Sequence, residues 1–157
     1  MVNKVIHLRQ VRTDDEAFLF VLFRHSREVE FSSLPHSQQE TLLNFQYQAQ
    51  SREYAARYPH SEHFIVEYCG QPAGRLLLNR EANETRVVDI AVLPELQGKG
   101  IATAVLKSLL AEAEAGGIAV RLSVWRSNPA LRLYQRLGFR ETARSATHLE
   151  LEWRSGT

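Results

Sequence analysis

The apolar residues of this chain recur with two different periods, and these periods predict where its strands and helices lie. Residues 147–153 alternate between apolar and polar side chains, which is typical of a strand with one buried face. In residues 101–115 the apolar side chains recur every three or four positions, which is typical of a helix with one buried face. That helical face comprises Ala102, Val105, Leu106, Leu109 and Ala113.

Capping and turn residues predict the other boundaries. Residues 13–16 and 37–40 both match the capping-box pattern, and we expect them to open helices that reach about Arg24 and about Tyr58. Residues 70–73 read as the turn of a hairpin, and Gly116-Gly117 ends the helix that starts at residue 101. The expected strands are Val5–Arg9, His63–Cys69, Gly74–Leu78, Thr85–Leu93, Ala119–Trp125, Glu141–Ala143 and Thr147–Trp153.

The order of these elements predicts one α/β domain over residues 1–157. It runs strand, two helices, three strands, helix, strand, helix, two strands, without a repeat or a linker. With 157 residues, of which 44% are hydrophobic and 24% charged, the chain has the size and composition of an ordinary globular domain. We therefore expect a mixed sheet around one buried core.

Charge and cysteine content narrow the class of protein further. A net charge of +1 gives no reason to expect nucleic acid or a membrane surface as a partner, and no apolar run resembles a signal peptide or a membrane span. The single cysteine, Cys69, excludes an internal disulfide and is expected to be a small packing residue. The six histidines lack metal-ligand spacing, so we expect no metal. These features favour a cytoplasmic protein.

Residues 90–102 read as a site for a pyrophosphate. An apolar strand passes through Gly98-Lys99-Gly100 into a helix, so the backbone can approach a ligand and the first helical amides lack partners. A dinucleotide fingerprint would need a third glycine where Thr103 stands, and a Walker loop would need serine or threonine where Gly100 stands. The pattern that fits is Gln-x-x-Gly-x-Ala, over Gln97, Gly100 and Ala102.

A second motif lies in residues 124–139. Asn128 is placed to cap a helix, Pro129 suits its first position, and Gly138 is placed to end it. Tyr134 shares a helical face with apolar neighbours, so its position alone is equally consistent with an ordinary core aromatic.

These two segments resemble motifs A and B of the GNAT superfamily of acetyl-CoA-dependent N-acetyltransferases, and the element order over residues 4–153 matches that fold. The resemblance implies a mixed, mostly antiparallel sheet with splayed central strands and about four helices. It implies acetyl-CoA as co-substrate, with pantetheine along Ile90, Ala91 and Val92. It also implies that the pyrophosphate lies on the backbone of Gln97, Gly98, Lys99, Gly100, Ile101 and Ala102. The Lys99 side chain either reaches a phosphate or is simply solvated.

The resemblance also implies catalytic roles. Tyr134 matches the family tyrosine that protonates the departing thiolate, and Asn128 matches the asparagine that binds pantetheine or orders water. The positions that align with the family's glutamate base hold Arg86 and Ser123 here, and neither is a convincing base. Asp89 and Glu84 remain as candidates, although strand alternation predicts that Asp89 points away from the Arg86 face. A relay through ordered water is the alternative.

The acceptor amine is expected to bind before these motifs. Glu28 and Glu30 could attract a cationic amine, although such charges are often only solvated. Tyr47, Tyr54 and Tyr58 lie near one helical face and either wall a pocket or pack in the core. The sequence thus predicts acetyl transfer to a primary amine, with a small molecule favoured over a peptide or protein. A non-catalytic acyl-CoA sensor is a further alternative, and the terminal strands leave edges on which a homodimer could form.

Overall fold

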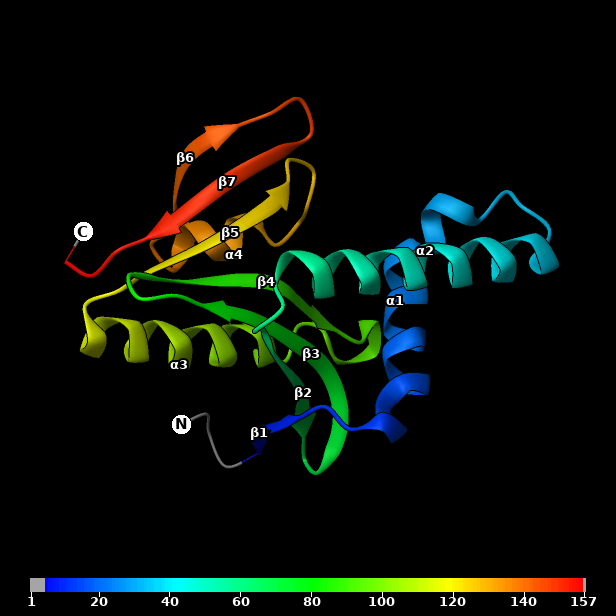
Figure 1. Ribbon diagram of the computed structural model, residues 1–157, viewed down its shortest axis with the longest axis horizontal. Helices are drawn as coiled ribbons and strands as arrows, with labels where there is room; N and C mark the ends of the chain where they lie inside the picture. The colour runs from blue at the N-terminus through cyan, green and yellow to red at the C-terminus, as the bar shows by residue number, and fades with distance from the viewer. Residues whose placement is uncertain (1–4, 157) are drawn as a thin grey trace.

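The computed structural model describes residues 5–156, apart from the side chains of Val29 and Glu30, and a seven-stranded sheet runs through it (Figure 1). Its strand order is β1-β2-β3-β4-β5-β7-β6, and every neighbouring pair is antiparallel except β4 and β5. The strands are β1 Ile6–Gln10, β2 Glu62–Tyr68, β3 Gln71–Arg80, β4 Glu84–Val92, β5 Ala119–Trp125, β6 Arg140–Arg144 and β7 His148–Trp153. The expected mixed sheet and element order are confirmed.

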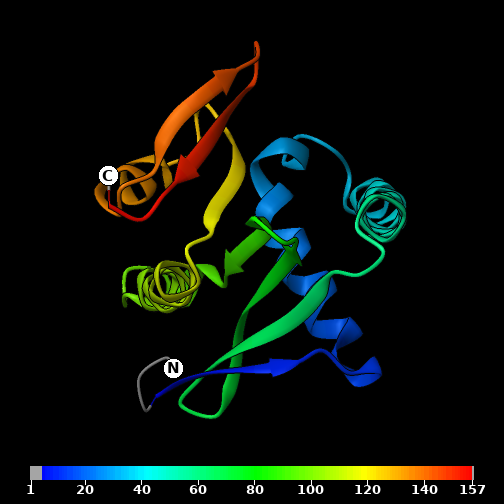
Figure 2. The same cartoon turned by 60° about the vertical axis from the view of Figure 1, so that its left-hand side comes forward.

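The helices cover opposite faces of this sheet. They are α1 Glu16–Phe31, α2 His36–Arg57, α3 Ile101–Gly116 and α4 Leu131–Arg136. Figure 2 shows α3 and α4 on one side of the sheet and α1 and α2 on the other. A large apolar core lies under α3 and α4, and a smaller one, which includes Phe23, Leu43 and Ile65, lies under α1 and α2. Over residues 5–156, no helix combines the length and apolar character needed to cross a membrane.

The helix that follows the glycine-containing turn forms as its periodicity predicts. Val105, Leu106, Leu109 and Ala113 are all buried, whereas Ala102 at the first turn is only partly covered. The buried side chains pack against the strands in the larger core, and burial of this area stabilises the helix far more than its propensity does. Because its first turn is fixed in this way, the position of the preceding loop is fixed too.

The two predicted capping boxes are wrong. Residues 13–15 form a short 3-10 turn, in which the Asp15 carboxylate accepts a hydrogen bond from the Arg12 amide at 2.7 Å. Asp15 is buried and paired with Arg9 at 2.8 Å, and this partner holds its pKa well below the ordinary range. Helix α1 then continues past Arg24 to Phe31, and α2 begins after Pro35 with no side-chain cap. Tertiary packing and an ion pair, rather than local capping, set these boundaries.

The hairpin between β2 and β3 turns earlier than predicted. Tyr68 pairs with Gln71, so the turn consists of Cys69 and Gly70, which both have positive φ (53° and 82°). Pro72 lies inside β3 next to a bulge at Ala73 of the same strand, where the missing amide is tolerated. Cys69 is therefore an exposed turn residue, and its expected role in packing is wrong.

Strands β4 and β5 begin as partners and then separate. The parallel pairing joins Glu84–Val87 to Ala119–Leu122 and continues no further. Beyond that point β4 stays paired with β3, and β5 stays paired with β7 as far as Trp125. The splayed central strands implied by the resemblance are thus present, and they leave the facing backbone groups of β4 and β5 without strand partners.

Candidate active site

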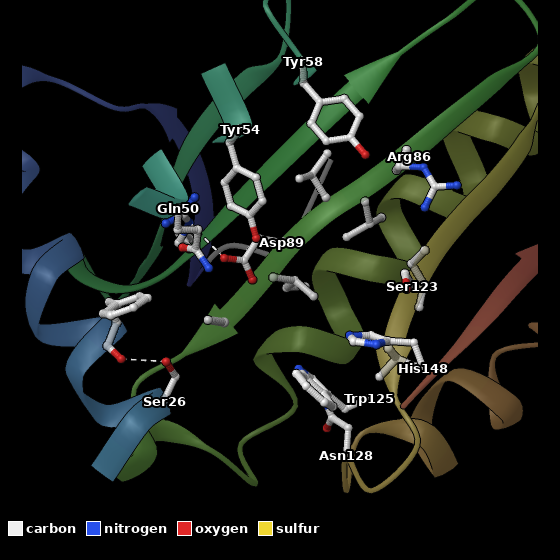
Figure 3. Close-up of a pocket in the computed structure, with 18 of the residues that line it drawn as sticks. Ser26, Gln50, Tyr54, Tyr58, Arg86, Asp89, Ser123, Trp125, Asn128 and His148 are labelled. Atoms are coloured by element: carbon white, nitrogen blue, oxygen red, sulfur yellow. Dashed lines mark hydrogen bonds and ion pairs between the residues drawn. The ribbon is translucent and has the colours of Figure 1, made fainter. Parts of the chain in front are cut away.

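A cavity of about 460 Å³ opens where β4 and β5 separate. Its walls come from α1, α2 and β3 on one side and from β4, β5, β7 and the α4 segment on the other (Figure 3). This volume falls within the usual range of small-molecule sites. The unpaired backbone of the two strands borders the cavity, so a ligand rich in amide groups could satisfy donors and acceptors that would otherwise be costly to bury.

A bulge in β4 turns Asp89 into this cavity. Leu77 pairs with Asp89 and Leu78 pairs with Val87, so Val88 is the extra residue. One extra residue reverses the alternation, and Asp89 therefore lies on the same face as Arg86. Figure 3 shows both side chains extending from β4 into the cavity. The expectation from alternation that Asp89 points away from Arg86 is wrong for this reason.

Asp89 has a low-polarity but cationic environment. Its Oδ2 lies 3.5 Å from Nε of Arg75, a guanidinium that is 8% exposed, and the Arg75 guanidinium in turn lies 5.9 Å from the ring centroid of Tyr54. Burial raises the pKa of Asp89 above its ordinary value, while Arg75 and Arg27 oppose that rise by stabilising the carboxylate. The site thus holds a carboxylate that is more basic than one in water.

Tyr134 and Asn128 line the same cavity from the α4 segment. Tyr134 is 6% exposed, and its ring packs edge-on against Phe139. Burial, with a smaller effect of the Asp89 charge, raises the pKa of Tyr134 to about 12, so the phenol keeps its proton at neutral pH. The Asn128 Oδ1 accepts a hydrogen bond from the Ala130 amide at 2.8 Å, but the helix itself begins only at Leu131, later than predicted.

The loop before α3 is open and presents backbone amides. Gly98 and Gly100 have positive φ (81° and 79°), and a Cβ added at either would meet no atom within 4 Å. The first amide that bonds back along the helix is that of Ala104, which donates to Gly100 O. The amides before it are therefore free of helical partners, at the end of the helix where the dipole is positive. Lys99 is exposed, and Gln97 Nε2 donates to the Val92 carbonyl at 3.1 Å.

This loop and the cavity satisfy the requirements of coenzyme A at two separate points. The free amides and the open space at Gly98 and Gly100 suit a pyrophosphate. The unpaired backbone of Ile90–Val92, on the way from loop to cavity, suits a pantetheine arm. The residues expected to bind the co-substrate therefore form one continuous segment, which runs from residue 90 in β4 to residue 102 in the first turn of α3.

Two of the predicted acidic residues, Glu84 and Glu28, do not line the cavity. Glu84 lies at the start of β4, where the strands are still paired, and its Oε1 is 3.4 Å from Nε of Arg121. Glu28 is exposed on α1 and lies 3.3 Å from Nδ1 of His25. The side chain of Glu30 lies outside the described residues. The residues that α1 does contribute to the cavity include Ser26 and Arg27.

Sequence reasoning missed several cavity residues that depend on long-range pairing. Arg86 donates to both carboxylate oxygens of Glu150 in β7, and Trp125 stacks on His148 with ring centroids 4.2 Å apart. The register of β5 and β7 places Ser123 opposite Glu150 and Trp125 opposite His148, and only a prediction of that register could have found them.

The three tyrosines that lie near one face of α2 serve both of the roles considered for them, as a pocket wall and as core packing. Tyr54 and Tyr58 line the cavity, as a pocket wall would. Tyr47 instead packs in the smaller core, and its hydroxyl donates to the Glu16 carboxylate at 2.8 Å. Its partner and burial raise the pKa of Tyr47 above the ordinary range. Helical spacing alone could not separate these residues, because they lie on two sides of the same face.

The sequence also matches a known family. A sequence model of the acetyltransferase (GNAT) family matches residues 20–139. The chain therefore belongs to the GNAT acetyltransferase family, and the resemblance inferred from motifs A and B is confirmed.

Solved structures with the same fold cover nearly the whole chain. PaiA N-acetyltransferase from Thermoplasma acidophilum, in complex with coenzyme A, is 17% identical with a TM-score of 0.71, over 95% of this chain and 98% of that one. A ribosomal-protein-alanine N-acetyltransferase from Escherichia coli is 20% identical with a TM-score of 0.65, over 97% and 95%. A GNAT family acetyltransferase from Elizabethkingia anophelis with acetyl-CoA bound is 17% identical with a TM-score of 0.61, over 97% and 99%. At these identities the similarity is one of fold.

Proposed function

We propose that this protein, acting as one domain, transfers the acetyl group of acetyl-CoA to a primary amine on a small molecule. The amine attacks directly, in a complex that holds both substrates. The observation that carries this proposal is the shared cavity of Asp89, Asn128 and Tyr134, which lies where β4 and β5 separate. One group there can accept a proton and another can donate one, as attack by an ammonium-derived nucleophile and departure of a thiolate require.

The backbone provides the co-substrate site in this proposal. The amides from Gln97 to Ala102 bind the pyrophosphate, and Ile90–Val92 pair with the pantetheine arm. Bound acetyl-CoA supplies a thioester carbonyl, and a backbone amide near Ala91 or Val92 polarises it and stabilises the oxyanion. Asn128 binds the pantetheine or holds a water beside it.

Asp89 serves as the base. An alkyl ammonium with a pKa of about 10.4 must lose a proton before it can attack, which costs roughly 4–5 kcal/mol at neutral pH. The cavity supports this assignment in two ways: burial raises the pKa of Asp89, and Arg75, 3.5 Å away, opposes that rise by favouring the ionised form. The proton passes to Asp89 directly or through one ordered water. Glu84, which is paired with Arg121 at the other end of β4, takes no part.

Tyr134 assists the leaving group. Its phenol has a pKa of about 12, above the value of about 8.5 for an ordinary thiol, so the proton remains on oxygen until negative charge has formed on the coenzyme A sulfur. The hydroxyl then donates a strong hydrogen bond to that sulfur, and the proton that it gives up as the thiol is released is replaced by the one that the attacking nitrogen loses on becoming an amide.

Thiol release from acetyl-CoA, measured against a panel of amines and short peptides, tests this function. Thermal unfolding with and without acetyl-CoA, read in parallel, reports binding through mass action. Turnover of a small amine with stabilisation by acetyl-CoA is the expected result. Turnover of peptides alone would move the acceptor to the peptide class. Stabilisation without turnover of any acceptor would favour a sensor, and no stabilisation would refute the co-substrate site.

Two matched variants on one strand separate the candidate bases. Asp89→Asn should lower kcat at least about 100-fold, the usual range for loss of a general base, while acetyl-CoA still stabilises the fold. Glu84→Gln makes the same chemical change outside the cavity and should leave kcat within about twofold. The reverse pattern would show that Glu84, and not Asp89, is needed for transfer.

A further inference from the structure

Cations outnumber carboxylates on the wall of the active-site cavity. Among the lining residues that the structure describes, the arginines are Arg27, Arg57, Arg75 and Arg86, and the carboxylates are Asp89 and Glu150. Three of the arginines come from α1, α2 and β3 on one side of the cavity, and Arg86 comes from β4 on the other. A cationic acceptor, which the sequence favoured, would enter a cavity that already holds an excess of positive charge.

Both carboxylates already face a guanidinium. Asp89 lies 3.5 Å from Arg75, and Glu150 accepts hydrogen bonds from both terminal nitrogens of Arg86. Little negative potential therefore remains in the cavity to attract a second ammonium group. The reacting amine of an acceptor has a partner in Asp89. The second ammonium group of a diamine would have no such partner at the far end of the acceptor.

Arg57 adds positive charge to the cavity wall next to Tyr58. It lies in the last turn of α2, and its guanidinium is 5.4 Å from the ring centroid of Tyr58. No carboxylate of residues 5–156 with a described side chain lies within ion-pair distance of it. The Tyr58 hydroxyl points toward Arg86 in Figure 3, and the two groups are close enough to interact electrostatically. We call Arg57, Tyr58 and Arg86 the cationic end of the cavity; because Arg86 is paired with Glu150, Arg57 is the guanidinium there that an anion can engage.

The cationic end and Asp89 are separated along β4. Arg86 and Asp89 are three positions apart, and the bulge at Val88 takes up one of them. Two ordinary strand steps of about 3.3 Å give a separation of roughly 7 Å between the two backbone positions. An acceptor that reaches from one to the other must therefore carry its two functional groups several bonds apart, which excludes the adjacent groups of an α-amino acid.

We infer that the acceptor is a primary amine whose far end carries an anionic group, a carboxylate or a phosphate, held at the cationic end while the amine lies at Asp89. This inference rests on the acetyl transfer proposed above and names its substrate class. A guanidinium binds either anion with two parallel hydrogen bonds, and the Tyr58 hydroxyl adds a further donor. The same charges reject an acceptor with a second ammonium group.

Three acceptors of equal chain length isolate the far end. Hexylamine, 6-aminohexanoate and 1,6-diaminohexane carry a neutral, an anionic and a cationic group there, and thiol release gives kcat/KM for each. We expect 6-aminohexanoate to exceed hexylamine about five- to tenfold, as for a partly exposed charge-assisted contact, and the diamine to be the poorest. The matching 5-aminopentylphosphonate decides between carboxylate and phosphate.

Substitution of Arg57 tests where the anion binds. Arg57→Gln should lower kcat/KM for 6-aminohexanoate more than for hexylamine and so remove most of the preference for the anionic acceptor, and Arg57→Lys should restore part of it. Arg52→Gln is the matched control, because Arg52 is exposed on the same helix and does not line the cavity. Its preference should equal that of the parent.

The outcomes separate this inference from the function it rests on. Turnover of the diamine equal to or above that of the ω-amino acid overturns the anionic acceptor and leaves amine acetylation intact. Equal preference in Arg57→Gln and the parent overturns the role of the cationic end. If acetyl-CoA stabilises the protein but no amine or peptide of any charge is acetylated, the proposed function fails and this inference fails with it.

Discussion

Gly74 is a position where one added carbon should damage both the fold and the co-substrate strand. It lies in β3 and pairs with Val92 of β4. A Cβ built on Gly74 overlaps the Ala91 carbonyl oxygen and lies 3.1 Å from both the Ala91 carbonyl carbon and Val92 Cα. All three atoms belong to backbone, which cannot rotate aside as a side chain could. Gly74→Ala therefore forces the two strands apart.

The size of this effect follows from the overlap. Carbon atoms pack at about 3.5–4.0 Å, so the Ala91 and Val92 backbone must move by roughly 0.5 Å, and further at the oxygen. Overpacking of a closely packed site costs about 1–3 kcal/mol, and more where backbone has to shift. We expect Gly74→Ala to lower the free energy of unfolding by about 2–4 kcal/mol. For a chain of this length, that loss of unfolding free energy corresponds to a fall in Tm of roughly 4–15 °C.

Denaturant unfolding and thermal unfolding, each with and without acetyl-CoA, measure both consequences. The free protein should be destabilised, and the added stabilisation by acetyl-CoA should shrink because Ala91 and Val92 have moved. Gly116→Ala is the control: Gly116 ends α3, and a Cβ there meets no atom within 4 Å. Its stability should be unchanged or up to about 1 kcal/mol higher. A Gly74→Ala variant as stable as the parent would refute the steric argument.

Three other predictions concern single residues. Tyr134→Phe should keep acetyl-CoA stabilisation and lower kcat about 10- to 100-fold, the value of one hydrogen bond to a charged group; turnover equal to the parent would remove Tyr134 from the mechanism. Gly100→Val places a side chain in the loop expected to hold the pyrophosphate, at a φ of 79°, so acetyl-CoA stabilisation should disappear in a variant that still folds. Asp15→Asn should cost about 1–2 kcal/mol at pH 7, where the ion pair with Arg9 is intact. Because that pair lowers the pKa of Asp15 in the folded state, its contribution is lost as pH falls below about 4, and denaturation curves for variant and parent should converge there.

The sequence predicted the elements whose period is set by burial. The sequence predicted the buried face of α3, the alternation in β7 and the order of strands and helices. Each of these depends on which side chains become buried on folding. The helix starts near residues 16, 36 and 101 were predicted too, but the way in which the first two are fixed was not, since Asp15 forms an ion pair with Arg9 of β1 and α2 starts without a side-chain cap. Local motifs could not reveal a partner that tertiary structure supplies.

The candidate site was predicted only where it is made of backbone. Residues 90–102 and the motif around Tyr134 carry glycines and turn residues that fix main-chain geometry, and the sequence displays these directly. The bulge at Val88 has no sequence signal, so the direction of Asp89 was missed. The pairing of Arg86 with Glu150 depends on the register of strands 64 positions apart, and the excess of arginine around the acceptor became visible only with the fold.

The separation of β4 and β5 has a kinetic consequence. The loop expected to hold the pyrophosphate precedes α3, which covers one face of the sheet, whereas the cationic end is formed partly by α2 on the other face (Figure 2). The gap between β4 and β5 thus connects the two faces of the sheet. An acetyl group would be transferred through this gap from the co-substrate on one side to the acceptor on the other. Neither substrate needs to pass the other on entry, so binding should follow no compulsory order. Initial-rate plots for the two substrates should intersect because both are bound together, and no dead-end analogue of either substrate should inhibit uncompetitively against the other.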